Sequence, residues 1–288
     1  MRACVIGSTN VDLVLDVPAL PMPGETVLGT GMRREAGGKG ANQACALVRL
    51  GGDVTFVSAV GADDDGRWSL DQLIAAGVSI DQVVSREGSS TGRAVVMVDP
   101  TGENAIVVVA GANELVAPPP TYDADVVLLS LEIPLEVVRA CVHAAHAAGI
   151  PVVLNAAPAQ PLPPDLLSRV EVLLVNESEL AALGGDTQAL LDIGAGAVVV
   201  TLGAKGCQLY EPAGTTSLPA ADVAVVDTTG AGDCFAAALS YGVGAGWPLA
   251  RAATLAIAAA ALAVTRPGAR GGQPTLSEAR ALLPTGER

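Results

Sequence analysis

The sequence predicts an α/β fold of three layers, with a mostly parallel central sheet between helices and a small β-sheet lid beside it. Two observations carry this prediction. Short apolar runs alternate with stretches of helical periodicity, and half of the 288 residues are hydrophobic, which is enough to cover both faces of a sheet. No repeat, low-complexity tract or Gly/Ser-rich linker divides the chain, so residues 1–288 are expected to form a single domain.

Six short apolar runs have the composition of buried strands. They lie at residues 3–6, 54–60, 126–130, 152–154, 172–175 and 197–201. Helical periodicity separates several of them, at residues 41–50, 68–76 and 134–148. Residues 231–264 are almost entirely helical in pattern, with a break near Gly244, Gly246 and Pro248.

Two segments interrupt this alternation, because they carry strands with no helix between them. They are residues 11–34 and 91–109, and the second has the pattern of a hairpin that turns at residues 99–102. Ligands of parallel α/β sheets bind at the carboxyl ends of the strands, so an antiparallel lid built from these segments would cover such a site. The alternative is that the hairpin only extends the edge of the main sheet.

Composition excludes several classes of partner. The 16 basic and 30 acidic residues give a net charge of −14, which disfavours nucleic acid and anionic membranes, and only seven side chains are aromatic. The apolar stretch 252–265 is too short to span a bilayer, and the N-terminus lacks the apolar stretch of a signal peptide. Five scattered cysteines predict neither disulfides nor a zinc site, so we expect a cytoplasmic protein.

The strongest chemical feature is DTTGAGD at residues 227–233. Walker-type and dinucleotide-binding glycine patterns are absent from the sequence. Here Gly230, Ala231 and Gly232 open a helix, so their free N–H groups are suited to bind a transferring phosphoryl group, and Asp233 beside them is suited to accept a proton from an attacking hydroxyl. The alternative is an ordinary glycine-rich turn with an acidic residue in the first helical turn.

Together with GGKGANQA at residues 37–44, this motif closely resembles the two signature regions of the ribokinase-type (PfkB) sugar kinases. Other segments match in the family's order along the whole chain, among them GSTNVD, PMPGETVLG, LNAAPA and AVTRPGA. The resemblance implies a ribokinase-like three-layer fold and ATP-dependent phosphorylation of D-ribose at O5, which yields D-ribose 5-phosphate and ADP. A sister kinase for deoxyribose, another sugar or a nucleoside is the alternative, as is a sensor that binds without turnover.

The resemblance also implies a set of sugar-binding residues, with Asp233 as the general base. These are Asn10, Asp12, Gly38, Lys39, Gly40, Ala41, Asn42 and Glu132. Polar side chains of these types suit a ligand rich in hydroxyls. Each also has a structural alternative: Asn10, Asp12 and Asn42 can cap turns or helices, and Glu132 can be a helix N-terminal acid.

For ATP and metal ions the resemblance implies a second set of residues. Residues expected along the nucleotide are Asn176, Thr201, Leu202, Gly203, Ala204, Lys205, Gly206 and Gly232. Glu179 would hold Mg²⁺ through water, and K⁺ would bind near Asp227, Thr229, Ala263, Arg266, Gly268 and Gly272. A homodimer through the lid is expected on the same ground.

Two positions depart from the family pattern. Gly272 stands where related chains commonly have Ser, which weakens the expectation of K⁺ dependence, and Ile257 replaces a His that some relatives place near adenine. The acidic run at residues 63–65 is interpreted as helix capping and solvated charge rather than as a metal site.

Overall fold

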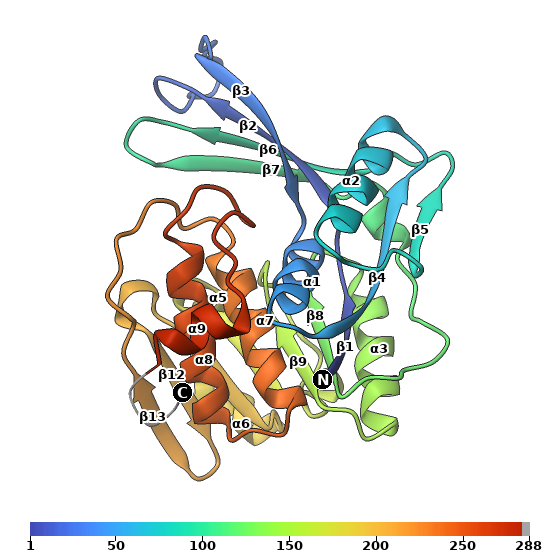
Figure 1. Ribbon diagram of the computed structural model, residues 1–288, viewed down its shortest axis with the longest axis vertical. Helices are drawn as coiled ribbons and strands as arrows, with labels where there is room; N and C mark the ends of the chain where they lie inside the picture. The colour runs from blue at the N-terminus through green and yellow to red at the C-terminus, as the bar shows by residue number, and fades with distance from the viewer. Residues whose placement is uncertain (284–288) are drawn as a thin grey trace.

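A nine-stranded sheet with the strand order β13-β12-β11-β10-β9-β8-β1-β4-β5 forms the centre of the computed structural model, which describes residues 1–283 (Figure 1). Its strands are β1 (Arg2–Ile6), β4 (Asp53–Gly61), β5 (Val83–Arg86), β8 (Val126–Ser130), β9 (Val152–Asn155), β10 (Val172–Asn176), β11 (Ala197–Thr201), β12 (Cys207–Glu211) and β13 (Gly214–Leu218). Neighbours from β5 to β11 pair in parallel, and only β12 and β13 pair antiparallel. The predicted mostly parallel sheet is confirmed.

Helices cover both faces of this sheet, because the inner strands are apolar on both sides. In β1, Ala3 and Val5 pack on one face, while Cys4 and Ile6 pack on the other. The first face is covered by α1 (Lys39–Arg49), α2 (Asp64–Ala75), α7 (Ala231–Gly244), α8 (Leu249–Ala263) and α9 (Leu276–Ala281). The second is covered by α3 (Leu135–Ala147), α4 (Pro164–Leu167), α5 (Glu177–Ala182) and α6 (Thr187–Ile193).

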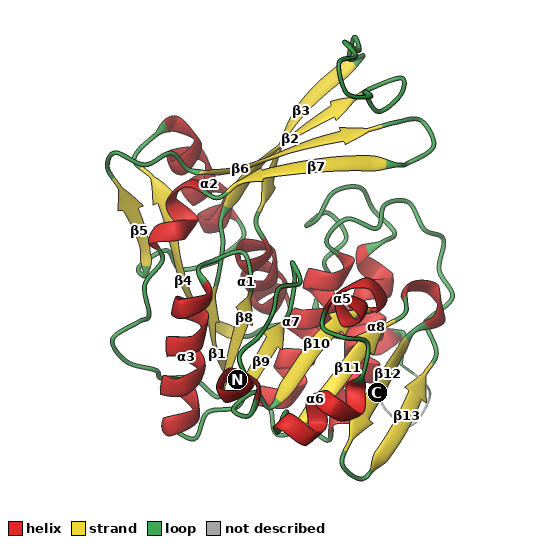
Figure 2. Cartoon of the chain, turned by 180° about the vertical axis from the view of Figure 1, so that it is seen from behind, coloured by secondary structure: helices red, strands yellow, loops and turns green. Residues whose placement is uncertain are grey.

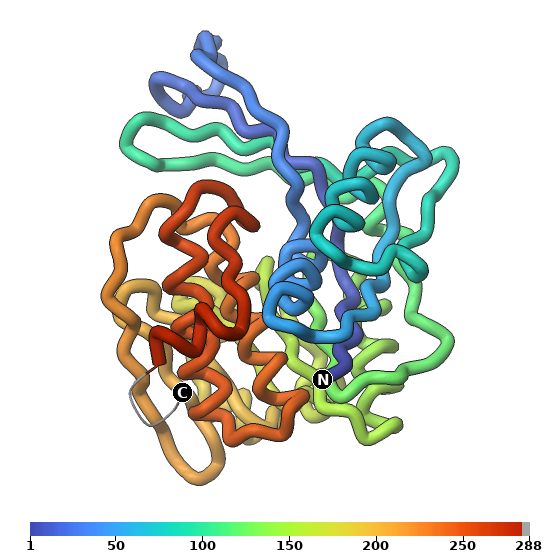
Figure 3. Tube along the Cα trace, in the orientation of Figure 1, coloured from blue at the N-terminus to red at the C-terminus, as the bar shows by residue number. Residues whose placement is uncertain are grey.

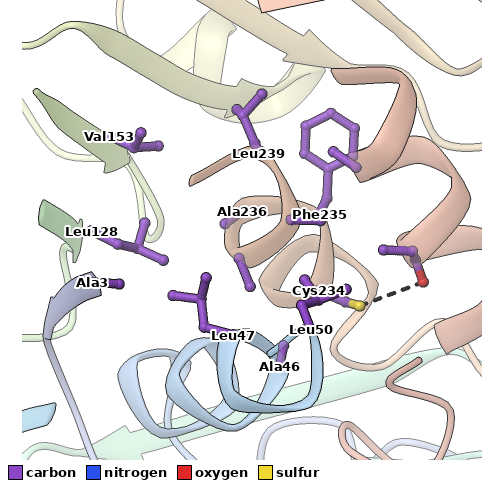
Figure 4. Packing of buried hydrophobic residues seen from close by; sticks show 14 of the residues in the cluster. Ala3, Ala46, Leu47, Leu50, Leu128, Val153, Cys234, Phe235, Ala236 and Leu239 are labelled. Carbon is purple, nitrogen blue, oxygen red and sulfur yellow. Dashed lines mark hydrogen bonds between the residues drawn. The ribbon is translucent and has the colours of Figure 1, made fainter. Parts of the chain in front are cut away.

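Helix α7 is the central element of the first face. Its residues 233–240 are all buried, and its alanines let α1, α8 and the sheet approach closely. Leu47 of α1 and Leu50 just after it lie against this helix near Cys234, whose thiol donates to the backbone oxygen of Ala259 in α8 at 3.4 Å (Figure 4). The start of α7 is therefore fixed by the core beneath it.

A separate four-stranded sheet, in the order β3-β2-β6-β7, forms the lid over the carboxyl edge of the main sheet (Figure 2). Its strands are β2 (Asn10–Asp16), β3 (Gly31–Gly37), β6 (Gly92–Val98) and β7 (Asn104–Val109). Parallel pairing of β2 with β6 brings the two distant segments side by side (Figure 3). The lid is thus its own sheet, not an extension of the main one.

The acidic run at residues 63–65 caps a helix and also forms ion pairs with the lid. Asp63 Oδ1 accepts from the Gly66 N–H at 2.8 Å, which is the predicted N-cap of α2. Asp65, however, pairs with Arg34 of β3 and Arg93 of β6. The interpretation of Asp65 as solvated charge is wrong, because its partners lie far away in the sequence and meet it only when the lid forms.

The antiparallel β12–β13 hairpin, β5 and the short helices α4, α5, α6 and α9 were not predicted. Each is short, from four to seven residues, so its periodicity is weak. Short 3₁₀ turns at Gly111–Leu115 and Gly203–Lys205 complete the regular structure of residues 1–283. Within that range no helix combines the length and apolar character needed to cross a membrane.

Truncating Leu47 to Ala tests the packing of α1 on α7. Leu47 is fully buried, so Leu47→Ala should lower the free energy of unfolding by about 2–5 kcal/mol, measured by chemical denaturation. Leu28→Ala is the control, because Leu28 is 84% exposed in the loop between β2 and β3, and its effect should stay below about 0.5 kcal/mol. Equal losses in the two variants would contradict the described core.

Candidate active site

The candidate site lies where five parallel strands of the main sheet end. Strands β1, β8, β9, β10 and β11 run in the same direction, so the polar residues that follow them meet at one edge. Helices α1 and α7 begin at the same edge, and the lid starts there through β2 and β3. Of the predicted residues, Asp233, Asn42, Lys39, Glu132 and Glu179 are brought into one electrostatic cluster.

Asp233 is the centre of this cluster. It is 6% exposed, and its carboxylate is held by α1: Asn42 Nδ2 donates to Oδ2 at 3.0 Å, and Gln43 Nε2 donates to Oδ1 at 3.2 Å. Desolvation by burial raises the pKa of Asp233, while the Lys39 charge and the Asn42 hydrogen bond oppose that rise. A buried carboxylate with two donors and a nearby cation is suited to accept a proton.

Lys39 supplies the positive charge of the site. The negative charge of Asp233, followed by those of Glu132 and Glu179, raises the pKa of its ammonium group despite burial. One cation therefore faces three carboxylates, which come from α7, from the loop after β8 and from α5. A negatively charged phosphoryl group entering this space would meet a cation and not only carboxylates.

The N-terminus of α7 provides the predicted anion-binding groups. Gly230 adopts a φ of 75°, and a side chain there would overlap the backbone of Ala269, so the tight entry into the helix needs glycine. The Ala231 N–H donates to the backbone oxygen of Thr228 at 3.2 Å. Within residues 1–283 the N–H groups of Gly230 and Gly232 have no such acceptor, and they are the freest donors of the predicted hole.

On the lid side, Asn10 and Asp12 project from β2. Asn113, which the sequence analysis did not single out, donates from Nδ2 to Asn10 Oδ1 at 2.7 Å and so fixes that amide. Asp12 Oδ1 is buried without a partner among residues 1–283, and burial, helped by the charges of Glu132 and Glu35, raises the pKa of Asp12 to about 7. An orphan carboxyl oxygen fits a ligand that brings hydroxyl donors.

Glu132 has a structural role beside its predicted one. Its Oε2 accepts from the Ser8 hydroxyl at 2.5 Å and from the Lys39 N–H at 3.1 Å, so it joins the end of β1 to the first turn of α1. Only the second carboxyl oxygen remains for a ligand. Gly38 is the N-cap of α1, and Gly40 and Ala41 lie in its first turn beside these groups, where they contribute backbone rather than side chains.

A cavity of about 490 Å³ lies on the other side of the α7 N-terminus. Most of its lining is apolar, and it includes five residues expected along the nucleotide: Thr201, Gly203, Ala204, Gly206 and Gly232. Residues 220–225 form a wall of the cavity that was not predicted, because that loop has no periodic pattern in the sequence. Ile257 does line the cavity.

Four other residues expected at the nucleotide or the magnesium ion do not line this cavity. Leu202 packs against the second-face core, and Lys205 is exposed outside the cavity lining. Asn176 and Glu179 bond one another in a reciprocal capping box of α5, at 2.8 Å in both directions. This leaves the Asn176 NH₂ group and Glu179 Oε1 for ligands.

The predicted K⁺-binding loops meet at Asp227. Its carboxylate accepts from the N–H groups of Thr229 and Gly268, each at 2.8 Å, so it joins the two loops. Burial raises the pKa of Asp227, but these hydrogen bonds outweigh burial and hold it below its usual value. Gly272 touches the carbonyl oxygen of Ala263 so closely that a side chain would overlap it.

The fold brings a buried carboxylate, a glycine-rich helix N-terminus and a largely apolar cavity together at this edge, an arrangement that defines the class of small-molecule kinases. The model of the pfkB family of carbohydrate kinases matches residues 2–276, and the chain belongs to that family. It is 38% identical to a ribokinase of Bacillus subtilis over 97% of this chain and 98% of that protein.

Solved structures agree with this assignment. The fold matches that of Arabidopsis thaliana ribokinase complexed with ribose and ATP with a TM-score of 0.90 and 33% identity, covering 99% of both chains. A ribokinase of Cryptococcus neoformans in complex with ADP matches with a TM-score of 0.84 and 36% identity over 98% of this chain and 99% of that one.

The raised pKa of Asp12 predicts a pH-dependent stability. The folded protein keeps the Asp12 proton up to about pH 7, whereas the unfolded chain releases it near the ordinary value of 3.8, so the free energy of unfolding falls as pH rises between these values. From pH 5 to pH 8, wild type should lose roughly 2 kcal/mol more than Asp12→Asn in chemical denaturation. Asp16→Asn, at the exposed end of the same strand, is the control and should follow wild type.

Proposed function

We propose that this protein transfers the γ-phosphoryl group of ATP to O5 of D-ribose, giving D-ribose 5-phosphate and ADP. The observation that carries the proposal is the buried Asp233 carboxylate, held by two amides of α1 at the glycine-rich start of α7. The ribose and ATP bound by the Arabidopsis relative support the choice of substrates.

In the proposed mechanism the sugar lies under the lid and presents its primary hydroxyl to Asp233. Asn10, Asp12, Asn42 and Glu132 would bind the other hydroxyls, because each has a polar atom at this edge. Asp233 accepts the proton as the hydroxyl oxygen attacks phosphorus. The N–H groups of residues 230–232 stabilise the charge that develops on the phosphoryl oxygens.

ATP would lie with its base in the 490 Å³ cavity and its phosphates toward Gly230 and Gly232. Residues 1–283 contain no cluster of three or more carboxylate, His or Cys side chains for a metal ion, which fits Mg²⁺ held mainly by water and phosphates. Glu179 Oε1 and Asn176 Nδ2 would face those waters and phosphates. When bound, Mg²⁺ would supply charge neutralisation on the phosphates.

K⁺ would bind at the Asp227 loops. K⁺ requires oxygen ligands, and the expected ones are all oxygens: the Asp227 carboxylate and the backbone carbonyls of Thr229, Ala263, Arg266 and Gly268. Gly272 adds no side-chain oxygen, and its contact with Ala263 leaves no room for one. We expect K⁺ to stimulate turnover through the position of the neighbouring anion hole.

The lid is the proposed surface of a homodimer. Edge strand β7 exposes four consecutive apolar side chains, Ile106, Val107, Val108 and Val109, each more than half exposed. An exposed apolar edge of this kind is normally covered by another chain. We also propose a cytoplasmic location, because all five cysteines are free and buried, which fits a reducing compartment.

Replacing the base tests the mechanism. Asp233→Asn removes the proton acceptor and should lower kcat about 10²–10⁴-fold in an assay of ADP release, with ATP binding retained. Asp71→Asn, which alters an exposed carboxylate of α2, should leave kcat unchanged. Near-wild-type turnover of Asp233→Asn would show that another group is the base.

Turnover on a panel of substrates tests the sugar assignment. ADP release with Mg-ATP, with and without K⁺, should be fastest on ribose when compared with 2-deoxyribose, fructose and several nucleosides, and K⁺ should increase it. Faster turnover on another substrate would refute ribose but retain the chemistry. ATP binding without ADP release on any substrate would instead indicate a sensor.

A charged side chain introduced into edge strand β7 tests whether the lid forms the dimer interface. Wild type should have about twice the 28.7 kDa chain mass in light scattering, and Val107→Glu should shift it to the monomer mass by burying a charge in the interface. Val84→Glu, on exposed strand β5, should remain dimeric. A monomeric wild type, or a dimeric Val107→Glu, would contradict the lid interface.

A further inference from the structure

Arg270 reaches from the loop between α8 and α9 to the start of α1. Its Nε donates to Asn42 Oδ1 at 2.9 Å, and a terminal nitrogen donates to the backbone oxygen of Gly37 at 3.3 Å. The ion pairs of residues 1–283 do not include Arg270. Its hydrogen bonds are therefore directed at an amide and at the end of lid strand β3, and not at a carboxylate.

The bond to Asn42 decides which way that amide points. An amide oxygen only accepts and an amide NH₂ only donates, while a guanidinium only donates. With Arg270 on one side, the Asn42 oxygen must face it, which turns the NH₂ group toward Asp233 Oδ2, 3.0 Å away. The reversed amide would place its oxygen against a carboxylate and its NH₂ against a guanidinium, and both hydrogen bonds would be lost.

The surrounding loop holds Arg270 in place. Gln273 Nε2 donates to the backbone oxygen of Asn42 at 2.9 Å, so the same loop is bonded to α1 a second time. Gln273 is 2% exposed and Asn42 is 6% exposed. Water therefore competes little for these bonds, which makes the orientation of the amide well determined.

We propose that Arg270 is a positioning residue for phosphoryl transfer, which acts by orienting the Asn42 amide so that it donates to Asp233. The inference rests on the proposed function, because it takes Asp233 as the base. It also places the positive charge of Arg270 near Asp12, where that charge counteracts the effects of burial and of the neighbouring carboxylates. Arg270 would thus support both the base and the sugar-binding carboxylate.

Two substitutions separate the hydrogen bond from the charge. Gln Nε2 stands at the same number of bonds from Cα as Arg Nε, so Arg270→Gln keeps a donor for Asn42 without the charge, and Arg270→Met keeps neither. Arg270→Met should lower kcat/KM for ribose about 10- to 100-fold, with KM for ATP unchanged. Arg270→Gln should recover most of that loss. Arg139→Gln, which removes an exposed ion pair between Arg139 of α3 and Asp165 of α4, is the matched control.

A double-mutant cycle tests the route through Asn42. If Arg270 acts by orienting Asn42, then Arg270→Met should lower kcat/KM for ribose less than about 3-fold in a protein that already carries Asn42→Ala. The same 10- to 100-fold loss in both backgrounds would overturn the proposal. So would an Arg270→Met enzyme within twofold of wild type, provided its thermal unfolding shows that it is folded.

A measurement without substrate keeps this inference separate from the proposed function. The carboxyl groups of the ligand-free protein can be titrated by ¹³C NMR. The charged groups around Asp233 are Lys39, Glu132, Glu179 and Asp12, and those around Asp12 are Glu132, Glu35, Asp233 and Arg270.

Arg270→Met should raise the midpoints of both Asp233 and Asp12, whereas Arg270→Gln should raise that of Asp12 alone. An unmoved Asp233 midpoint in Arg270→Met would overturn the proposal. A wild type that turns over no sugar would refute the proposed function, and these titrations would still decide the role of Arg270.

Discussion

The hydrogen bonds between α1 and the Asp233 carboxylate are the constraint on which the rest of the site depends. A carboxylate that is almost fully buried is stable only with donors around it, and here both donors, Asn42 and Gln43, are consecutive residues of one helix. Because α1 and α7 pack against each other and against the same face of the sheet, the core fixes the distance between them. The same helix entry at Gly230 presents the N–H groups that would receive a phosphoryl group.

Electrostatics explains how an acidic chain can bind an anionic nucleotide. The net charge is −14, yet this edge combines Lys39 with helix N-termini, and its carboxylates other than Asp12 already accept hydrogen bonds from the protein. Glu132 and Glu179 each use one oxygen to hold the local backbone, and one remains free. The site therefore offers a few directed oxygens rather than a diffuse negative surface, which suits a ligand that carries both hydroxyls and phosphates.

The sequence predicted the fold well where periodicity is strong. The strands at 126–130 and 197–201 agree with β8 and β11 to the residue, and the break near Pro248 separates α7 from α8. The segments 37–44 and 227–233 were recognisable because each places its glycines within a few residues of the charged residue beside them, Lys39 or Asp233, at the start of a helix. Short edge elements such as β5 and β13 lacked enough residues to show a pattern.

What the sequence could not predict are contacts between distant segments. Asn113 and Arg270 carry no local signal, and their importance is visible only when the fold places them beside Asn10 and Asn42. Asp65 looked like part of a solvated acidic run until the lid brought two arginines to it. Lys39 and Lys205 both stand in glycine-rich segments, but of the two only Lys39 lies among the carboxylates of the site. The glycines around Lys39 lead into the buried helix α1, whereas Lys205 lies in an exposed 3₁₀ turn.

The central claim is that Asp233 is the group that meets the attacking hydroxyl. A crystal structure of the protein with ribose and a non-hydrolysable ATP analogue would test it most directly. We expect the primary hydroxyl of ribose at hydrogen-bond distance, about 3 Å, from the Asp233 carboxylate, with the terminal phosphate at the N–H groups of Gly230 and Gly232. A sugar whose primary hydroxyl faces another residue, or a nucleotide outside the cavity beside α7, would contradict it.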